Sequence, residues 1–332
     1  MAAARDLHVV CAGETLVDFL PLEPGRAVKD VERWRPCPGG SPANVAVGVA
    51  RLGGRSAMVG AVGRDELGDF LKERLAQEGV DVSRLRQTDE GKTGLVFISL
   101  TGSGERSFAH YRTRSAEFFF SGRDLDPAFL ARARAVHLGS NSLLFAEAQR
   151  AMIQLARAAR EAGQIVCCDP NLRLECWPDP GELKRTLEQL LPCCTVVKLA
   201  EDELAFATGE ASPDGALRAL ERMGVPLPVV TLGAAGARLS FRGARLEVGA
   251  KEVKVVDTTG AGDGFVAALL FGLTRRCAGR EEVLGLDAAE IQELAGFACQ
   301  AASRVCERLG AVDGLPRAGE LQAIWPASLS RD

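Results

Sequence analysis

The chain has 332 residues, of which 47% are apolar and 25% are charged. This is the balance of an ordinary globular protein, and the chain is long enough to bury a large α/β core. The formal net charge of −4, with no block of basic residues, argues against nucleic acid or an acidic membrane as the main partner. No apolar run reaches the ~18 residues of a membrane-spanning helix, and no secretory signal opens the chain, so we expect a cytoplasmic protein.

Ten cysteines are spread along the chain, including the neighbouring pairs Cys167–Cys168 and Cys193–Cys194 in apolar runs. No C-x-x-C spacing occurs, which argues against a metal site or a disulfide framework. We therefore expect buried, reduced thiols.

The first part of the chain mixes strands and helices without regular alternation. Ser41 is expected to cap the first helix, with Pro42 at its first position, and Gly79 to end the second. Residues 15–22 alternate between apolar and polar, which predicts a half-exposed strand outside the main sheet. The expected elements are strands 9–13, 15–22, 57–62, 94–100 and 106–111, and helices 42–52 and 67–78.

From about residue 133 strands and helices alternate, which predicts βαβ units and a parallel sheet covered on both faces. The strand-rich stretches at about 14–36 and 94–120 break this alternation. We expect them to form a small β-sheet lid over the carboxyl ends of the main strands, inserted in a single domain that spans 1–332. The expected elements here are strands 135–138, 165–168, 195–199 and 228–232, and helices 146–162, 180–191, 201–208 and 214–223.

Residues 257–265 (DTTGAGDGF) form the most informative stretch. They follow a β-branched run at Val253, Val255 and Val256, which predicts a strand, and they precede a helical run at 266–273. Such a turn points backbone N–H groups at one spot, where the helix dipole favours negative charge. The carboxylate of Asp263 at this turn is suited to remove a proton from a hydroxyl group, while the N–H groups stabilise the charge on a transferring phosphoryl group.

Four further groups of residues fall at predicted strand ends and would line one crevice with Asp263. Each also has a plainer interpretation: tight turns for the glycines, a helix cap near Asn44, and solvated surface for the acid and for the Asp169–Arg173 cluster. Together they favour a polar ligand between two walls. They are Asp18, the Gly39-Gly40 turn with Asn44, the pair Asn171 and Arg173, and Thr231 with Gly233 and Gly236.

These motifs resemble those of the ribokinase-like (PfkB) carbohydrate kinases. The resemblance rests on 39–53 (GGSPANVAVGVARLG), on 63–65 with Gly68, and on 257–265, and it runs from about residue 9 to 316. Within the family, Gly13-Glu14, Tyr111-Arg112 and 169–173 are most similar to the fructokinases. The 2-keto-3-deoxygluconate kinases share several of these features.

The resemblance implies a three-layer α/β/α fold with a mostly parallel, Rossmann-like central sheet, and transfer of the γ-phosphate of ATP to a primary sugar hydroxyl. Asp263 would be the general base, and the amides of Gly260, Ala261 and Gly262 the anion hole. The sugar would contact Asp18, Gly39, Gly40, Asn44, Arg112 and Arg173, and the nucleotide Lys198, Thr231, Gly233 and Gly236.

The resemblance also implies metal ions. Many family members carry Asn-x-x-Glu where this chain has 198–201 (KLAE). Glu201 would still orient Mg²⁺ through water, whereas Lys198 cannot accept a hydrogen bond from a metal-bound water and would approach the phosphates instead. Asp257 and Thr259 match positions that hold a monovalent cation such as K⁺, with the loop near Gly310.

Two alternatives remain open. A 2-keto-3-deoxygluconate kinase would need converging basic groups, which Arg112, Arg114 and Arg173 can supply. A non-catalytic sugar or nucleotide sensor would be expected to lose the base or the glycines, and both are present. The run 118–120 (FFF), placed on the lid, leads us to expect a homodimer formed through the lids.

Overall fold

The computed structural model describes residues 5–23, 25–100, 106–139, 141, 143–177 and 179–326. Its centre is a nine-stranded sheet in the order β13-β12-β11-β10-β9-β8-β1-β4-β5. Only β12 and β13 run antiparallel to their neighbours. The strands are β1 (Leu7–Ala12), β4 (Ser56–Gly63), β5 (Asp81–Thr88), β8 (Ala133–Leu138), β9 (Ile165–Cys168), β10 (Val196–Ala200), β11 (Leu227–Thr231), β12 (Ala237–Phe241) and β13 (Ala244–Val248).

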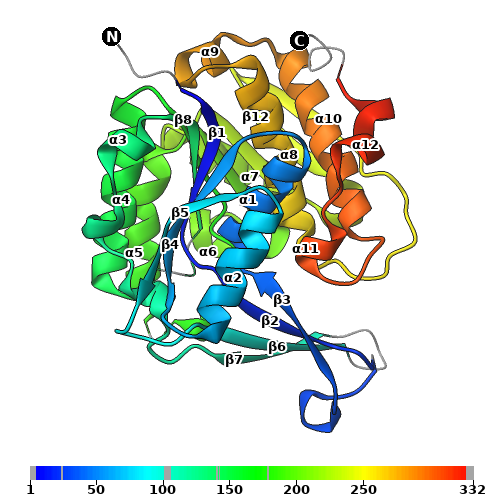
Figure 1. Ribbon diagram of the computed structural model, residues 1–332. Helices are drawn as coiled ribbons and strands as arrows, with labels where there is room; N and C mark the ends of the chain where they lie inside the picture. The colour runs from blue at the N-terminus through cyan, green and yellow to red at the C-terminus, as the bar shows by residue number, and fades with distance from the viewer. Residues whose placement is uncertain are drawn as a thin grey trace.

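Helices cover both faces of this sheet, which confirms the three-layer α/β/α architecture (Figure 1). Alternate residues of β1 face opposite layers: Val9 and Cys11 belong to one apolar core, and Val10 and Ala12 to the other. One layer contains α1 (Ser41–Arg51), α2 (Glu66–Gln77), α8 (Ala261–Arg276) and α10 (Ala288–Val305), and the other α4 (Ala146–Glu161), α5 (Pro180–Leu190), α6 (Leu204–Thr208) and α7 (Pro213–Arg222). The remaining short helices are α3 (Pro127–Leu130), α9 (Arg280–Gly285), α11 (Ala311–Gly314) and α12 (Ala318–Leu321).

A second sheet of four strands, the lid sheet, lies at one end of the main sheet (Figure 1). Its order is β3-β2-β6-β7, and period-2 alternation places Leu16, Asp18 and Leu20 on one face. On that face Leu16 and Leu20 belong to a small apolar cluster of their own. The strands are β2 (Leu16–Pro21), β3 (Trp34–Gly39), β6 (Leu95–Leu100) and β7 (Arg106–Tyr111).

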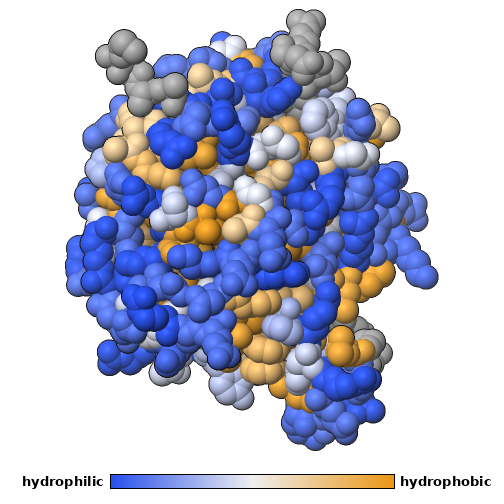
Figure 2. Space-filling view, viewed as in Figure 1, coloured by the Kyte–Doolittle hydropathy of each residue, from blue (hydrophilic) through white to orange (hydrophobic). Residues whose placement is uncertain are grey.

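The opposite face of the lid sheet carries aromatic rings. Phe97 stacks on Phe19 at 4.7 Å between ring centroids and meets Tyr111 edge-on at 5.5 Å. Tyr111 remains 64% exposed. Figure 2 shows apolar residues gathered over this part of the molecule, among largely polar surroundings.

Three expectations about local structure are wrong. Residues 253–256 form no strand: Val255 and Val256 are exposed, and the amide of Val256 donates to the Cys306 carbonyl instead of to a neighbouring strand. Phe118 and Phe120 are buried beside the main sheet, in and just after the 3₁₀ turn Ala116–Phe119, so they offer no lid surface for a dimer.

Ser41, the third case, does not cap α1. It is the first helical residue, and Gly40 occupies the cap with a φ of 98°.

None of the ten cysteines, all of which lie in the described part of the chain, forms a disulfide, and eight of them are buried. Among the described helices, none is long and apolar enough to cross a membrane.

Candidate active site

The first turn of α8 carries the expected general base. Gly260 precedes the helix with a φ of 79°, and a Cβ there would lie 2.7 Å from the Cβ of Ala311. Both conditions require glycine at this position. The turn buries Asp263 to 8% exposure at the helix N-terminus.

Two side chains of the first turn of α1 hold the Asp263 carboxylate. The Ser41 hydroxyl donates to Oδ1 at 2.6 Å, and Asn44 Nδ2 donates to Oδ2 at 2.7 Å. Burial raises the pKa of Asp263, while these two hydrogen bonds lower it. Each oxygen is therefore oriented by one donor, and the carboxylate keeps further acceptor capacity for a substrate hydroxyl.

Lys198 lies on the other side of the α8 N-terminus. It projects from β10, and its ammonium is 3.0 Å from Oδ2 of Asp169, the residue that follows β9; both side chains are buried. A Cβ placed on Gly262 would be 3.1 Å from Lys198 Nζ. Burial lowers the pKa of Lys198 and the Asp169 carboxylate raises it, with a net upward shift. A charged ammonium thus adjoins the amides of the turn, which is a favourable place for phosphate.

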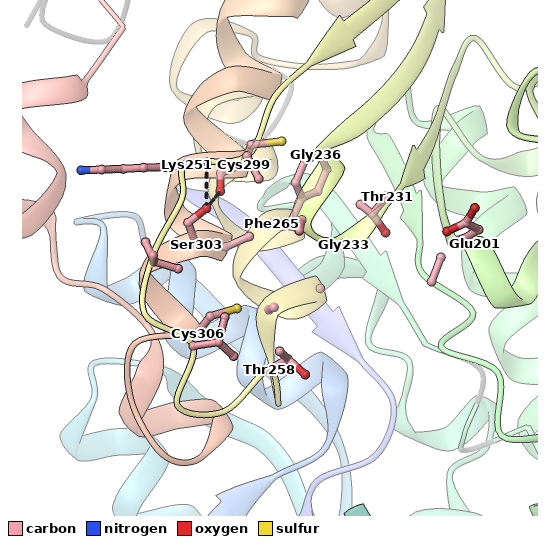
Figure 3. A pocket seen from close by; sticks show the side chains of 18 of the residues that line it. Glu201, Thr231, Gly233, Gly236, Lys251, Thr258, Phe265, Cys299, Ser303 and Cys306 are labelled. Atoms are coloured by element: carbon pink, nitrogen blue, oxygen red, sulfur yellow. Dashed lines mark hydrogen bonds between the residues drawn. The ribbon is translucent and has the colours of Figure 1, made fainter. Parts of the chain in front are cut away.

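A cavity of about 950 Å³ opens beside this turn (Figure 3). Glu201 and Thr231 lie on one wall of the cavity, together with Gly233 and Gly236. The other wall was not predicted. There the Lys251 amide donates to the Ser303 hydroxyl at 3.2 Å, and Ser303 donates to the Cys299 carbonyl at 3.0 Å. The side chains and backbone of this second wall come from Ala250, Lys251, Glu252, Val253, Val255, Cys299, Ala302, Ser303 and Cys306.

Asp18 marks the opposite end of the crevice. A Cβ on Gly39 would overlap the Asp18 carboxylate, so glycine at 39 lets the β3–α1 turn lie against it. Burial raises the pKa of Asp18 to about 7; the Arg112 guanidinium opposes this shift and the Asp263 carboxylate adds to it. Asp18, Arg112 and Asp263 therefore share one electrostatic environment.

Arg112 is committed to a buried ion pair. Its Nε donates to Oε1 of Glu117 at 2.9 Å, its Nη2 donates to the Asn141 carbonyl at 3.2 Å, and its guanidinium lies over the Phe118 ring. Glu117 is fully buried and Arg112 nearly so. The positive charge of Arg112 is thus matched by a carboxylate of the protein itself.

Comparison with known proteins identifies the family at this point. The model of the pfkB family carbohydrate kinases matches residues 6–318. The chain belongs to this family.

The kinase resembles a probable chloroplastic fructokinase-6 of Arabidopsis thaliana, with 37% identity over 93% of this chain and 80% of the relative. Its fold resembles the fructokinase of Xylella fastidiosa with bound ATP (TM-score 0.87, 32% identity, 96% and 98% of the two chains). It also resembles the fructokinase of Vibrio cholerae O395 with fructose, ADP and calcium (TM-score 0.82, 33% identity, 97% and 100%). The protein is thus an ATP-dependent sugar kinase with fructokinase homologues.

Two further candidate residues of the kinase, Asn171 and Arg173, follow β9 and form hydrogen bonds within the protein. Arg173 is half-buried after β9, and its Nη1 donates to the Leu172 carbonyl at 2.9 Å. Asn171 adopts a φ of 45°, and its carbonyl accepts from Asn141 at 3.4 Å. Asn141 therefore links the end of β9 to Arg112, because its own carbonyl accepts the hydrogen bond from the Arg112 guanidinium.

The two glutamates that flank Asp202 occupy different positions, and only Glu201 was expected near Mg²⁺. Glu203 is buried and accepts from the amides of Leu172 and Ala200, whereas Glu201 faces the cavity. A carboxylate open to the phosphate side fits Mg²⁺, which is commonly bound through one or two carboxylates, waters and substrate phosphates. Asp257 accepts from the amide and hydroxyl of Thr259 and from the Gly310 amide at 2.8 Å, so it joins the two loops expected around a monovalent cation.

Proposed function

We propose that this kinase transfers the γ-phosphate of ATP to a primary hydroxyl of a ketohexose, namely fructose. The observation that carries the proposal is the position of Asp263. Its carboxylate is oriented by Ser41 and Asn44. The Lys198 ammonium lies beside Gly262 of the same turn.

In this mechanism Asp263 removes the proton from the attacking hydroxyl. The amides of Gly260, Ala261 and Gly262 and the Lys198 ammonium stabilise the charge on the transferring phosphoryl group. Positioning and charge stabilisation supply most of the rate, and the base adds roughly 10²–10⁴-fold. Mg²⁺, when bound with ATP near Glu201, supplies further charge neutralisation. Closure of the lid sheet over the crevice excludes water and limits wasteful hydrolysis of ATP.

The two walls supply the two substrates. ATP occupies the cavity lined by Thr231, Gly233 and Gly236, and the sugar hydroxyls bind Asp18 and the backbone at Gly39–Gly40. The fructokinases of Xylella and Vibrio, one with bound ATP and one with fructose and ADP, support this pair of substrates. Against 2-keto-3-deoxygluconate stands the pairing of Arg112 with Glu117, because the charge of this guanidinium is already matched.

An ATP-coupled screen over ketoses, aldoses and sugar acids tests the substrate. Fructose should give the highest kcat/KM; a clear preference for 2-keto-3-deoxygluconate would overturn the ketohexose assignment. Asp263→Asn tests the mechanism: it should fold and bind ATP but lose at least ~10²-fold in kcat. Near wild-type turnover in this variant would show that Asp263 is not the base.

We also propose that the kinase forms a homodimer through its lid sheets, now on the evidence of exposed Tyr111 on the aromatic face of the lid sheet instead of Phe118–Phe120. Light scattering at working concentration tests this. A monomeric mass would contradict it.

A further inference from the structure

Glu14 is a buried acid at the sugar end of the crevice that the mechanism above does not use. It follows β1 at the carboxyl edge of the main sheet, two residues before the lid strand β2 begins. Its exposure is 1%. Ionised carboxylates are rarely buried to this extent unless they are paired or serve a site.

One oxygen of Glu14 has nothing to bind among the described residues. Oε2 is fully buried and has no hydrogen-bond partner there. It lies 3.6 Å from the point where a Cβ of Gly139 would stand, and that point is 3.1 Å from Cγ of Pro42 in the first turn of α1. An unsatisfied carboxylate oxygen costs stability, so its retention beside the catalytic turn of α1 points to a ligand that donates a hydrogen bond.

The surroundings of Glu14 also belong to the sugar site. Burial raises the pKa of Glu14 to about 7; Arg112 opposes this shift, whereas Glu117 and Asp263 add to it. The same Arg112 and Asp263 act on Asp18. Glu14 and Asp18 are therefore both close to Arg112 and Asp263.

The charges at this end of the crevice do not cancel. Among the described residues, Arg112 is the cation that acts on both Glu14 and Asp18, and its ion partner at 2.9 Å is Glu117. Ionised Glu14, Asp18 and Asp263 therefore leave an excess of negative charge above neutral pH. A ligand carboxylate would add like charge in a desolvated site, whereas a hydroxyl group would donate to it.

We propose that Glu14 is a specificity-determining residue: its carboxylate accepts a hydrogen bond from a sugar hydroxyl and, together with Asp18, excludes sugar acids from the crevice. The substrate class is then neutral polyhydroxy sugars. The proposal rests on the proposed function and deepens it, because it names the group that separates a ketohexose from a keto-deoxy acid.

Glu14→Gln tests this, since it keeps the shape and removes the charge. At pH 8 the KM for fructose should rise about 10-fold or more, as expected for the loss of a hydrogen bond to a charged group, with kcat changed only a few-fold. The inhibition constant of 2-keto-3-deoxygluconate, measured as a competitor of fructose, should fall relative to the KM for fructose. At pH 5.5, where Glu14 is largely protonated in the wild type, the difference in KM between the two enzymes should shrink.

A KM for fructose within twofold of wild type at pH 8 would overturn the proposal. So would a rise in KM that is equal at both pH values, which a purely structural role predicts. Should Glu14→Gln fail to fold, Glu14→Asp carries the test, because it keeps the charge and withdraws the carboxylate by one methylene group. It should raise the KM for fructose, and an unchanged KM would again overturn the proposal.

The experiment distinguishes failure of the proposed function from failure of the Glu14 proposal. Failure of the proposed function appears in the wild-type enzyme as an absence of fructose phosphorylation. Failure of the Glu14 proposal appears only in the variants, against a wild type that phosphorylates fructose.

Discussion

Asp18→Asn should stabilise the unliganded kinase while weakening sugar binding, and the gain in stability should grow with pH. The pKa of Asp18 is raised from 3.8 to about 7 by burial. A carboxyl group with a raised folded-state pKa contributes stability that is fully present below pH ~4 and is lost as the pH rises through ~7. The amide of asparagine does not ionise, so the variant escapes this loss.

The size of the effect follows from the shift. At ~1.36 kcal/mol per pH unit, the advantage of the variant would be about 1.7 kcal/mol at pH 5 and about 4.3 kcal/mol at pH 8, a widening of about 2.6 kcal/mol. Asp18 borders the crevice and is only partly buried, so water there reduces the widening to about 1–2 kcal/mol.

Urea unfolding of the unliganded wild type and of Asp18→Asn at pH 5, 6, 7 and 8 measures this difference directly. The difference between the two free energies of unfolding is more informative than either value, because the other titrating groups are common to both proteins. Parallel pH profiles would refute the reasoning, since they would mean that Asp18 titrates at its ordinary pKa. The KM for fructose should rise in the same variant at pH 8, because an ionised acceptor of sugar hydroxyls has been lost.

Two further predictions concern the phosphoryl-transfer groups. Ser41→Ala should raise the pKa of Asp263, because it removes a hydrogen bond to the ionised carboxylate. The acidic limb of the pH profile of kcat/KM should therefore move ~1–2 pH units higher. An unmoved limb would contradict a role for Ser41 in setting the pKa of the base. Lys198→Met should lower kcat by ~10²–10³-fold and the free energy of unfolding by ~3–5 kcal/mol, because it leaves Asp169 buried without its partner. The double variant with Asp169→Asn should recover stability, measured by urea unfolding, but not kcat, and a recovery of both would show that Lys198 serves only the fold.

The general architecture could be predicted because two local signals agree. Strand and helix patterns alternate from residue 133 onward, and glycines and polar residues follow the strand ends. Parallel strands bring those ends to a common edge, which is why Asp169 and Thr231 meet around one crevice without being close in sequence.

What the sequence could not provide is the pairing of side chains across that crevice. Ser41 has the residue type and position of an N-cap, and only the positive φ of Gly40, one residue earlier, releases its hydroxyl for Asp263. The second wall of the nucleotide cavity is built largely from backbone at 250–253 and from small side chains of α10 such as Ser303, which have the pattern of an ordinary helix face. In the sequence Glu14 is a single acidic residue after a predicted strand. Only the packed structure shows that its Oε2 atom is buried without a hydrogen-bond partner among the described residues.

The short segment 39–44 explains why the two substrates of this kinase meet at one point. Gly39 lies against the Asp18 carboxylate, while Ser41 and Asn44 hold the two oxygens of Asp263. One rigid turn and the helix that follows it therefore fix the distance between the acid expected to bind the sugar and the acid expected to remove its proton. A displacement of this helix N-terminus would misplace both together, so substitutions here should change KM and kcat jointly, whereas Glu14→Gln, which removes neither hydrogen bond to Asp263, should separate them.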